Sequence, residues 1–115
     1  MYKDWKQTAN DLAGLMQQVG KGVPDVAKQF AGLDRAVSVD GALSCKQKEL
    51  MALAIGIAIR CEGCIAFHAK AAVKYGATRD EILETIGLAI YMGGGPSYVY
   101  GAQALEAFDT FSQDA

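Results

Sequence analysis

The sequence lacks the features that nucleic-acid-binding and membrane-spanning proteins need. Its formal net charge is −2, and no basic run is interleaved with aromatic residues, so we expect no nucleic-acid partner. The most apolar run, Leu50 to Ile59, is flanked by Glu49 and Arg60. Because a membrane span needs about 20 apolar residues, this shorter run predicts a buried helix, and no membrane association is expected.

Signs of secretion are also missing. Asp4, Trp5 and Lys6 interrupt any hydrophobic segment near the first residue, and no small-residue cleavage pattern follows. The three cysteines are an odd number, and two of them are separated by only two residues, which does not suit a framework of structural disulfides. We therefore expect a cytoplasmic protein whose cysteine pair serves catalysis or metal binding.

Strand signals are almost absent from the 115 residues, whereas apolar residues recur at helical spacing. Four helix starts are marked by a capping box or an early proline: Ser44 with Gln47, Thr78 with Glu81, Pro24 and Pro96. The expected helices span about 2–19, 24–40, 44–60, 61–76, 78–93 and 96–112. We predict one all-α domain over residues 1–115, a compact six-helix bundle too small for a separate cofactor domain.

Cys61, Cys64 and His68 fall on one face of the fourth expected helix, at about 100° per residue. The same face is apolar, so the thiols should point inward, toward a pocket closed to bulk water that a small substrate can enter. Cys61 lies near the helix N-terminus, which lowers a thiol pKa, while His68 can accept a proton from Cys64. The adjacent Glu62 opposes thiolate formation. Spacing alone leaves both sulfurs as candidates for the attacking thiol.

Other interpretations of these residues stay open at this point. Cys61, Cys64 and His68, with Glu49 as a fourth ligand, are a chemically competent zinc set, although no second cysteine pair accompanies them. Simple core packing is another reading. Glu49 alone would be a solvated carboxylate or a partner for Lys46 or Lys48. It lies about 18 Å from Cys61 along a continuous helix, so only a fold-back could join them.

For Cys45 and three of the tyrosines we expect ordinary structural roles. Cys45 is far from the cysteine pair in sequence and is expected to be a spectator. Tyr91, Tyr98 and Tyr100 could line a pocket or a subunit interface, with ordinary packing the favoured role for each.

Taken together, Glu49, Cys61-Glu62-Gly63-Cys64 and His68 resemble the core motif of the AhpD-like alkylhydroperoxidases, in the carboxymuconolactone decarboxylase superfamily. The Tyr75-Gly76-Ala77-Thr78 turn and the segment from Tyr91 to Pro96 resemble that family too. The resemblance covers roughly residues 44–108. One departure is Gly63, which occupies a position where some alkylhydroperoxidases carry a second histidine.

The resemblance implies an all-helical subunit that assembles as a homo-oligomer, a trimer or a hexamer, and reduces small-molecule hydroperoxides. It assigns the peroxidatic role to Cys64, the resolving role to Cys61, and a proton relay to His68 and Glu49. It implies no bound cofactor but an external dithiol reductant protein, which in well-studied members is a lipoylated protein.

Two alternative functions accompany this expectation. Lactone decarboxylation gives the superfamily its name, but the decarboxylases lack the cysteine pair. A non-enzymatic redox sensor would use the same two cysteines without repeated turnover.

Overall fold

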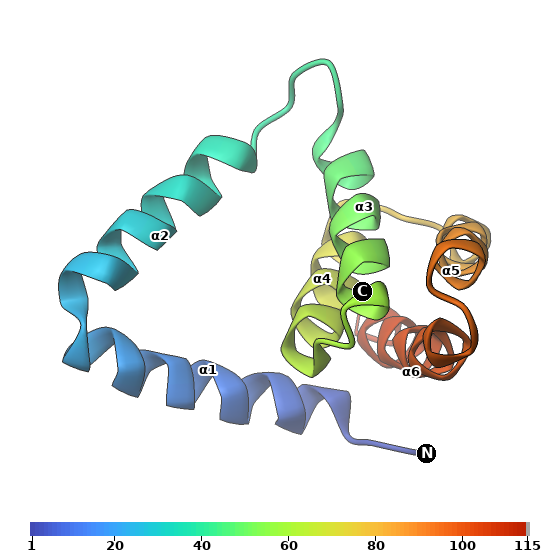
Figure 1. Ribbon diagram of the computed structural model, residues 1–115, viewed down its shortest axis with the longest axis horizontal. Helices are drawn as coiled ribbons and strands as arrows, with labels where there is room; N and C mark the ends of the chain where they lie inside the picture. Colours follow the sequence, from blue (N-terminus) through green and yellow to red (C-terminus); the bar gives the residue numbers. More distant parts are fainter. Residues whose placement is uncertain (115) are drawn as a thin grey trace.

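The computed structural model describes residues 1–114 and contains six α-helices joined by short connections (Figure 1). They are α1 (Trp5–Gly22), α2 (Pro24–Val37), α3 (Cys45–Ala58), α4 (Glu62–Lys74), α5 (Arg79–Gly93) and α6 (Gly95–Ser112). Within the described residues there is no β-strand, so the all-α prediction is confirmed.

Helices α3 to α6 pack together and form the body of the molecule (Figure 1). Its centre consists of fully buried branched side chains and alanines: Leu53, Ile57, Ile65, Ala66, Ala69, Ala72, Ile82, Ala104 and Ala107. Because alanine adds little bulk, α4 and α6 can lie close to each other and to α3. The cysteine pair thus lies at the start of a tightly packed helix, α4.

Helices α1 and α2 form an arm that extends away from the body (Figure 1). The arm is anchored by Trp5, which is fully buried and donates a hydrogen bond from Nε1 to Glu106 at 2.9 Å. Beyond Ala9 no residue of α1 is buried, and α2 has no buried residue at all. The far end of the arm therefore has no apolar partner within the described chain.

The helix boundaries match the expectations in the body and differ in the arm. The capping boxes at Ser44 and Thr78 are both present. Helix α1 begins three residues later than expected, because the Asp4 side chain accepts the backbone N–H of Gln7. It also continues through Gly20 to Gly22 instead of stopping at Val19.

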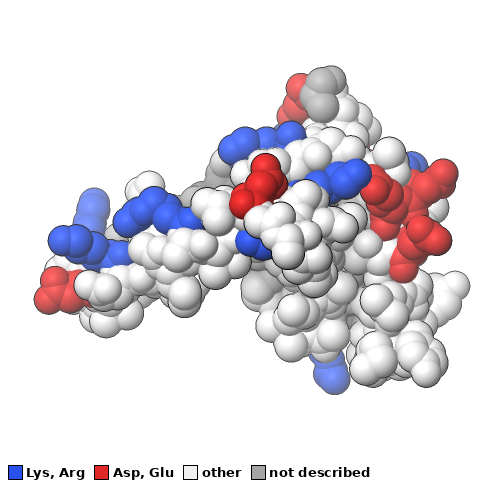
Figure 2. Space-filling view, turned by 90° about the horizontal axis from the view of Figure 1, so that it is seen from above, with Lys and Arg blue, Asp and Glu red and all other residues white. Residues whose placement is uncertain are grey.

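Charged side chains of both signs are spread over the surface that Figure 2 shows, with white surface between them along the arm. Among residues 1–114, no helix combines the length and apolar character that crossing a bilayer requires.

Candidate active site

The connection between α3 and α4 places the first cysteine. Arg60 adopts a left-handed backbone conformation, with φ of 60°. Its N–H donates to the Ile57 carbonyl at 3.1 Å, and the Cys61 N–H donates to the Gly56 carbonyl at 2.9 Å. These two bonds close the end of α3 in a Schellman motif and turn the chain back at once. The fold-back that the Glu49 spacing required is therefore present.

Cys61 is the N-cap of α4 and not a residue on its face, which corrects the expected helical alignment. Its Sγ accepts the backbone N–H of Cys64 at 3.2 Å. A disulfide joins Cys61 to Cys64, whose Cα atoms are 5.2 Å apart. Both cysteines are only partly buried, so in a single chain the sulfurs are less enclosed than the sequence predicted.

His68 lies one turn beyond Cys64 on α4 and forms a close pair with Glu49 of α3. The distance between His68 Nδ1 and Glu49 Oε2 is 2.6 Å. In the tautomer that donates from Nδ1 to the Glu49 carboxylate, Nε2 is left to exchange a proton. The Glu49 side chain is 16% exposed, so its interpretation as a solvated carboxylate is wrong.

The two lysines considered as partners for Glu49 have other roles. Lys46 pairs with Glu81 at 3.0 Å. Lys48 Nζ donates to the Val37 and Val39 carbonyls at 2.8 and 2.7 Å, which ties the end of α2 to the body.

A small cavity of about 110 Å³ lies beside the Glu49–His68 pair. Its lining includes Cys45, Val37 and Tyr75. Partial burial, followed by the effect of Asp40, raises the pKa of the Cys45 thiol above its ordinary value of 9.0. A protonated thiol is a poor nucleophile, which agrees with the interpretation of Cys45 as a spectator.

Two further residues shape this site. Gly56 lets α3 approach Cys64, since a Cβ there would lie 2.8 Å from the Cys64 Cβ. Lys3 forms an ion pair with Glu62 and so offsets the negative charge next to Cys61. The small residues of the apolar helix, Gly56 among them, predict that a neighbouring helix can approach closely, and this is confirmed. The role of Lys3 was missed, because nothing local to the sequence links it to Glu62.

A family model for the carboxymuconolactone decarboxylase family matches residues 24–107. The chain belongs to this family. The match begins at α2 and includes all four residues of the candidate site.

Relatives of this family member extend over nearly the whole chain. A protein of Cupriavidus necator is 32% identical over 97% of this chain and 99% of its own length. A protein encoded in the cox locus of Paracoccus denitrificans is 34% identical over 88% of each chain.

Two crystal structures of carboxymuconolactone decarboxylase family proteins have the same fold. The Legionella pneumophila protein, in its apo form, has a TM-score of 0.90 and 46% identity, covering 94% of this chain and 96% of its own. The Thermotoga maritima protein has a TM-score of 0.77 and 30% identity, covering 96% and 92%, and is described in connection with an antioxidative response. The AhpD-like resemblance is thereby confirmed at the level of family and fold.

The zinc interpretation of the cysteine pair requires at least three ligand side chains close together. Among residues 1–114, no three His, Cys, Asp or Glu side chains are grouped so that they could hold a metal ion.

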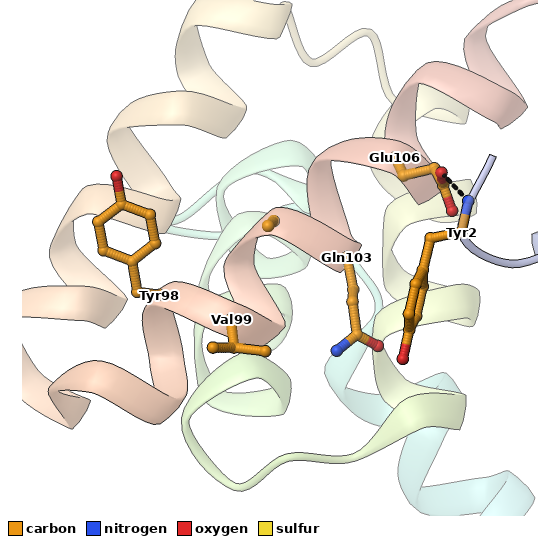
Figure 3. Close-up of a pocket in the computed structure, with 6 residues that line it drawn as sticks. Tyr2, Tyr98, Val99, Gln103 and Glu106 are labelled. Carbon is orange, nitrogen blue, oxygen red and sulfur yellow. Dashed lines mark hydrogen bonds between the residues drawn. The ribbon is translucent and has the colours of Figure 1, made fainter.

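Tyr98 lines a separate groove of about 460 Å³ with Tyr2, where the Tyr2 N–H donates to Glu106 (Figure 3). Tyr91 and Tyr98 are 83% and 67% exposed, so ordinary packing is wrong for them, whereas Tyr100 packs against the core.

Proposed function

We propose that this protein is a thiol-dependent hydroperoxide reductase that cycles the Cys61–Cys64 disulfide. The observation that carries the proposal is a disulfide-bonded cysteine pair at the start of α4, followed one turn beyond Cys64 by a histidine held by a carboxylate. Peroxide reduction by thiols needs a dithiol and an adjacent group that can donate and accept a proton, and this site contains both.

In the first step the Cys64 thiol passes its proton to His68, and the resulting thiolate attacks the terminal oxygen of the hydroperoxide. The O–O bond breaks, sulfur is oxidised to the sulfenic acid, and the alkoxide leaves with a proton from His68 to give the alcohol. The Glu49 carboxylate stabilises the charged imidazole between proton transfers. The hydroperoxide gains two electrons when it becomes the alcohol, and the Cys64 sulfur loses the same two.

In the second step the Cys61 thiol gives up its proton and its sulfur attacks the Cys64 sulfenic acid; the disulfide forms, the S–O bond breaks, and the departing hydroxide takes up that proton to leave as water. An external dithiol, with a lipoylated protein as one candidate, then reduces the disulfide and is itself oxidised. Attack on Cys64 would expel Cys61, whose Sγ accepts the Cys64 N–H at the helix start. A thiolate stabilised in this way is a good leaving group, which favours recycling.

The comparison with the Thermotoga maritima protein supports this proposal, since an antioxidative response is consistent with peroxide removal. The assignment of Cys64 as peroxidatic rests on the AhpD-like resemblance. Homo-oligomer formation, a lipoyl partner and a cytoplasmic location stay predictions.

Mass spectrometry of reduced protein treated with one equivalent of a hydroperoxide tests the proposal. We expect a Cys61–Cys64 link in the wild type and a sulfenic acid at Cys64 in Cys61→Ser, in which the serine oxygen keeps the N-cap acceptor. Oxidation confined to Cys45, or no oxidation, would contradict the proposal.

The two alternative functions give different results. Repeated turnover with a dithiol present separates an enzyme from a redox sensor, which would be oxidised once by each equivalent. Lactone decarboxylation that survives in a Cys61→Ala, Cys64→Ala double variant would favour the decarboxylase.

A further inference from the structure

The first residues of the chain are fastened to α6 by a single carboxylate. Glu106 accepts the backbone N–H groups of Tyr2 and Lys3, at 2.7 and 2.9 Å, and the indole N–H of Trp5 at 2.9 Å. The Trp5 side chain is fully buried. We call these four residues the N-terminal clamp. The clamp fixes the backbone from which the Lys3 side chain extends.

The Lys3 ammonium group is held between an aromatic ring and a carboxylate. Its Nζ lies 5.2 Å from the centre of the Trp5 ring, where the indole attracts a cation, and it forms an ion pair with Glu62. Within residues 1–114, Lys3 is the only residue that forms an ion pair with Glu62. Loss of the Lys3 charge would therefore leave the Glu62 carboxylate uncompensated.

The N-terminal part of the chain contacts both residues that separate the two cysteines. Lys3 pairs with Glu62, and a Cβ on Gly63 would lie 3.3 Å from Cδ1 of Leu12 in α1. These contacts come from a segment that precedes residues 24–107, the stretch matched by the family model. The surroundings of the disulfide are thus completed from outside that stretch.

Glu62 and Cys61 compete for the positive end of one helix. Cys61 is the N-cap of α4, and Glu62 is the first residue of the helix. Both a thiolate and a carboxylate are stabilised there, but two neighbouring negative charges repel each other. Because a disulfide carries no charge, this repulsion affects only the reduced protein.

We infer that Lys3 is a positioning residue for the redox centre. By neutralising Glu62 it stabilises the Cys61 thiolate, which raises the reduction potential of the Cys61–Cys64 disulfide. The same effect makes Cys61 a better leaving group when an external dithiol reduces the disulfide.

Reduction of the disulfide takes place in two exchanges. A thiolate of the external dithiol bonds to the Cys64 sulfur, the S–S bond breaks, and its electron pair leaves on Cys61. The second thiol of the dithiol then gives its proton to solvent and attacks the mixed disulfide, which releases the Cys64 thiolate and the oxidised dithiol. Two electrons pass from the dithiol to the protein, and Lys3 favours the first exchange.

Equilibration with oxidised and reduced dithiothreitol near pH 8 tests the potential. In Lys3→Met, which keeps an unbranched side chain without the charge, we expect the equilibrium constant for disulfide reduction to fall about threefold. This change corresponds to a potential about 14 mV more negative than that of the wild type. An unchanged equilibrium constant would overturn the inference.

Two further variants serve as controls for the charge. Lys3→Arg retains the cation and should have the wild-type potential. Lys6→Met removes the same charge from a different ion pair, that of Lys6 with Asp114, and should also have the wild-type potential. A Lys6→Met protein as difficult to reduce as Lys3→Met would mean that net charge matters and the position of Lys3 does not.

A double variant separates charge from contact. Lys3→Met combined with Glu62→Gln has neither charge beside Cys61, so its potential should return close to that of the wild type although the ion pair is lost. A double variant as difficult to reduce as Lys3→Met would overturn the inference. Trp5 is the only tryptophan, so its fluorescence shows whether both variants keep the clamp to the same degree.

The consequence for turnover rests on the proposed function, whereas the potential does not. With a saturating hydroperoxide, we expect kcat/KM for dithiothreitol to be about twofold lower in Lys3→Met, because exchange rates follow the stability of the leaving thiolate only in part. Equal values would overturn the effect on turnover. If the wild type reduces no hydroperoxide, the proposed function fails, and the dithiothreitol equilibrium still decides the role of Lys3.

Discussion

Gly56 of α3 and Cys64 of α4 approach each other so closely that no side chain fits between them. A Cβ on Gly56 would lie 2.8 Å from the Cys64 Cβ and 3.6 Å from the Cys64 carbonyl carbon. Close-packed helices do not absorb such an overlap without moving. The missing side chain at position 56 therefore sets the spacing of the two helices at the disulfide.

Replacing Gly56 with alanine should push the start of α4 away from α3. We expect the free energy of unfolding to fall by about 1–3 kcal/mol, as in other overpacked cores. Peroxide-driven disulfide formation should slow as well, because Cys61 is held by the Gly56 carbonyl. Urea denaturation and timed thiol trapping measure the two effects.

Gly87→Ala is the matched control for this variant. No heavy atom lies within 4 Å of the place its Cβ would take. Alanine in the middle of α5 should raise the free energy of unfolding by about 0.5–1 kcal/mol through helix propensity. Equal stability changes at the two glycines would mean that the helix contact is not limiting.

The Glu49–His68 pair leads to a prediction about rate. In Glu49→Gln the histidine loses a charged partner while the shape of the site is kept, so the proton needed by the leaving alkoxide is delivered less readily. We expect peroxide reduction to slow on the order of 100-fold, within the range typical of general acid–base groups. Stopped-flow measurement of thiol loss checks this.

The control for Glu49→Gln is Glu84→Gln, an exposed carboxylate of α5. It should react at the wild-type rate. A Glu49→Gln protein that is equally fast would exclude the pair from the rate-limiting proton transfer.

Cys45 should be the slowest of the three thiols to alkylate in reduced protein near neutral pH. Its raised pKa, caused first by partial burial and then by Asp40, leaves little thiolate. Asp40→Asn removes the negative charge but retains an acceptor for the Cys45 backbone N–H, so alkylation of Cys45 should accelerate. Peptide mass mapping after a timed iodoacetamide pulse gives the rate.

Asp25→Asn on α2 removes a charge from another part of the surface and should leave the Cys45 rate unchanged. If Cys45 is instead the fastest thiol in the wild type, its role as a spectator would have to be abandoned.

The body of the fold could be predicted because its signals are local. Capping boxes at Ser44 and Thr78 and the glycine at position 76 fix helix ends through hydrogen bonds between residues close in sequence. The predicted stop at Gly20 failed because a glycine ends a helix through a left-handed conformation, which Gly20 does not adopt. Composition alone does not reveal which glycines adopt the left-handed conformation that ends a helix.

The site could be predicted only in part, since its key contacts join separate elements. The left-handed residue that ends α3 is Arg60, not a glycine, so the pattern favoured a helix running to that residue, with Cys61 on the face of the next. Glu49 and His68 are 19 residues apart and meet only because the chain reverses at that point. The family resemblance supplied this contact, whereas helical periodicity could not.

The N-terminal segment should respond to acid through Glu106. The backbone N–H groups of Tyr2 and Lys3 donate to this carboxylate, at 2.7 and 2.9 Å, and lower its pKa below the ordinary value of 4.5. The folded state therefore favours the ionised form. The stabilisation is fully present above pH 4.5 and is lost as the pH falls through the lower pKa of the folded state.

Glu106→Gln should consequently be less stable than the wild type near neutral pH, and the gap should narrow as the pH falls through the lowered pKa of Glu106 in the folded wild type. Urea denaturation of both proteins near pH 7 and near pH 3 measures the gap, and the exposed variant Glu84→Gln shows how much any surface carboxylate contributes. Because both proteins share the other acidic groups, their difference isolates Glu106. A gap that persists unchanged in acid would mean that Glu106 holds the N-terminal segment by shape and packing and not by its charge.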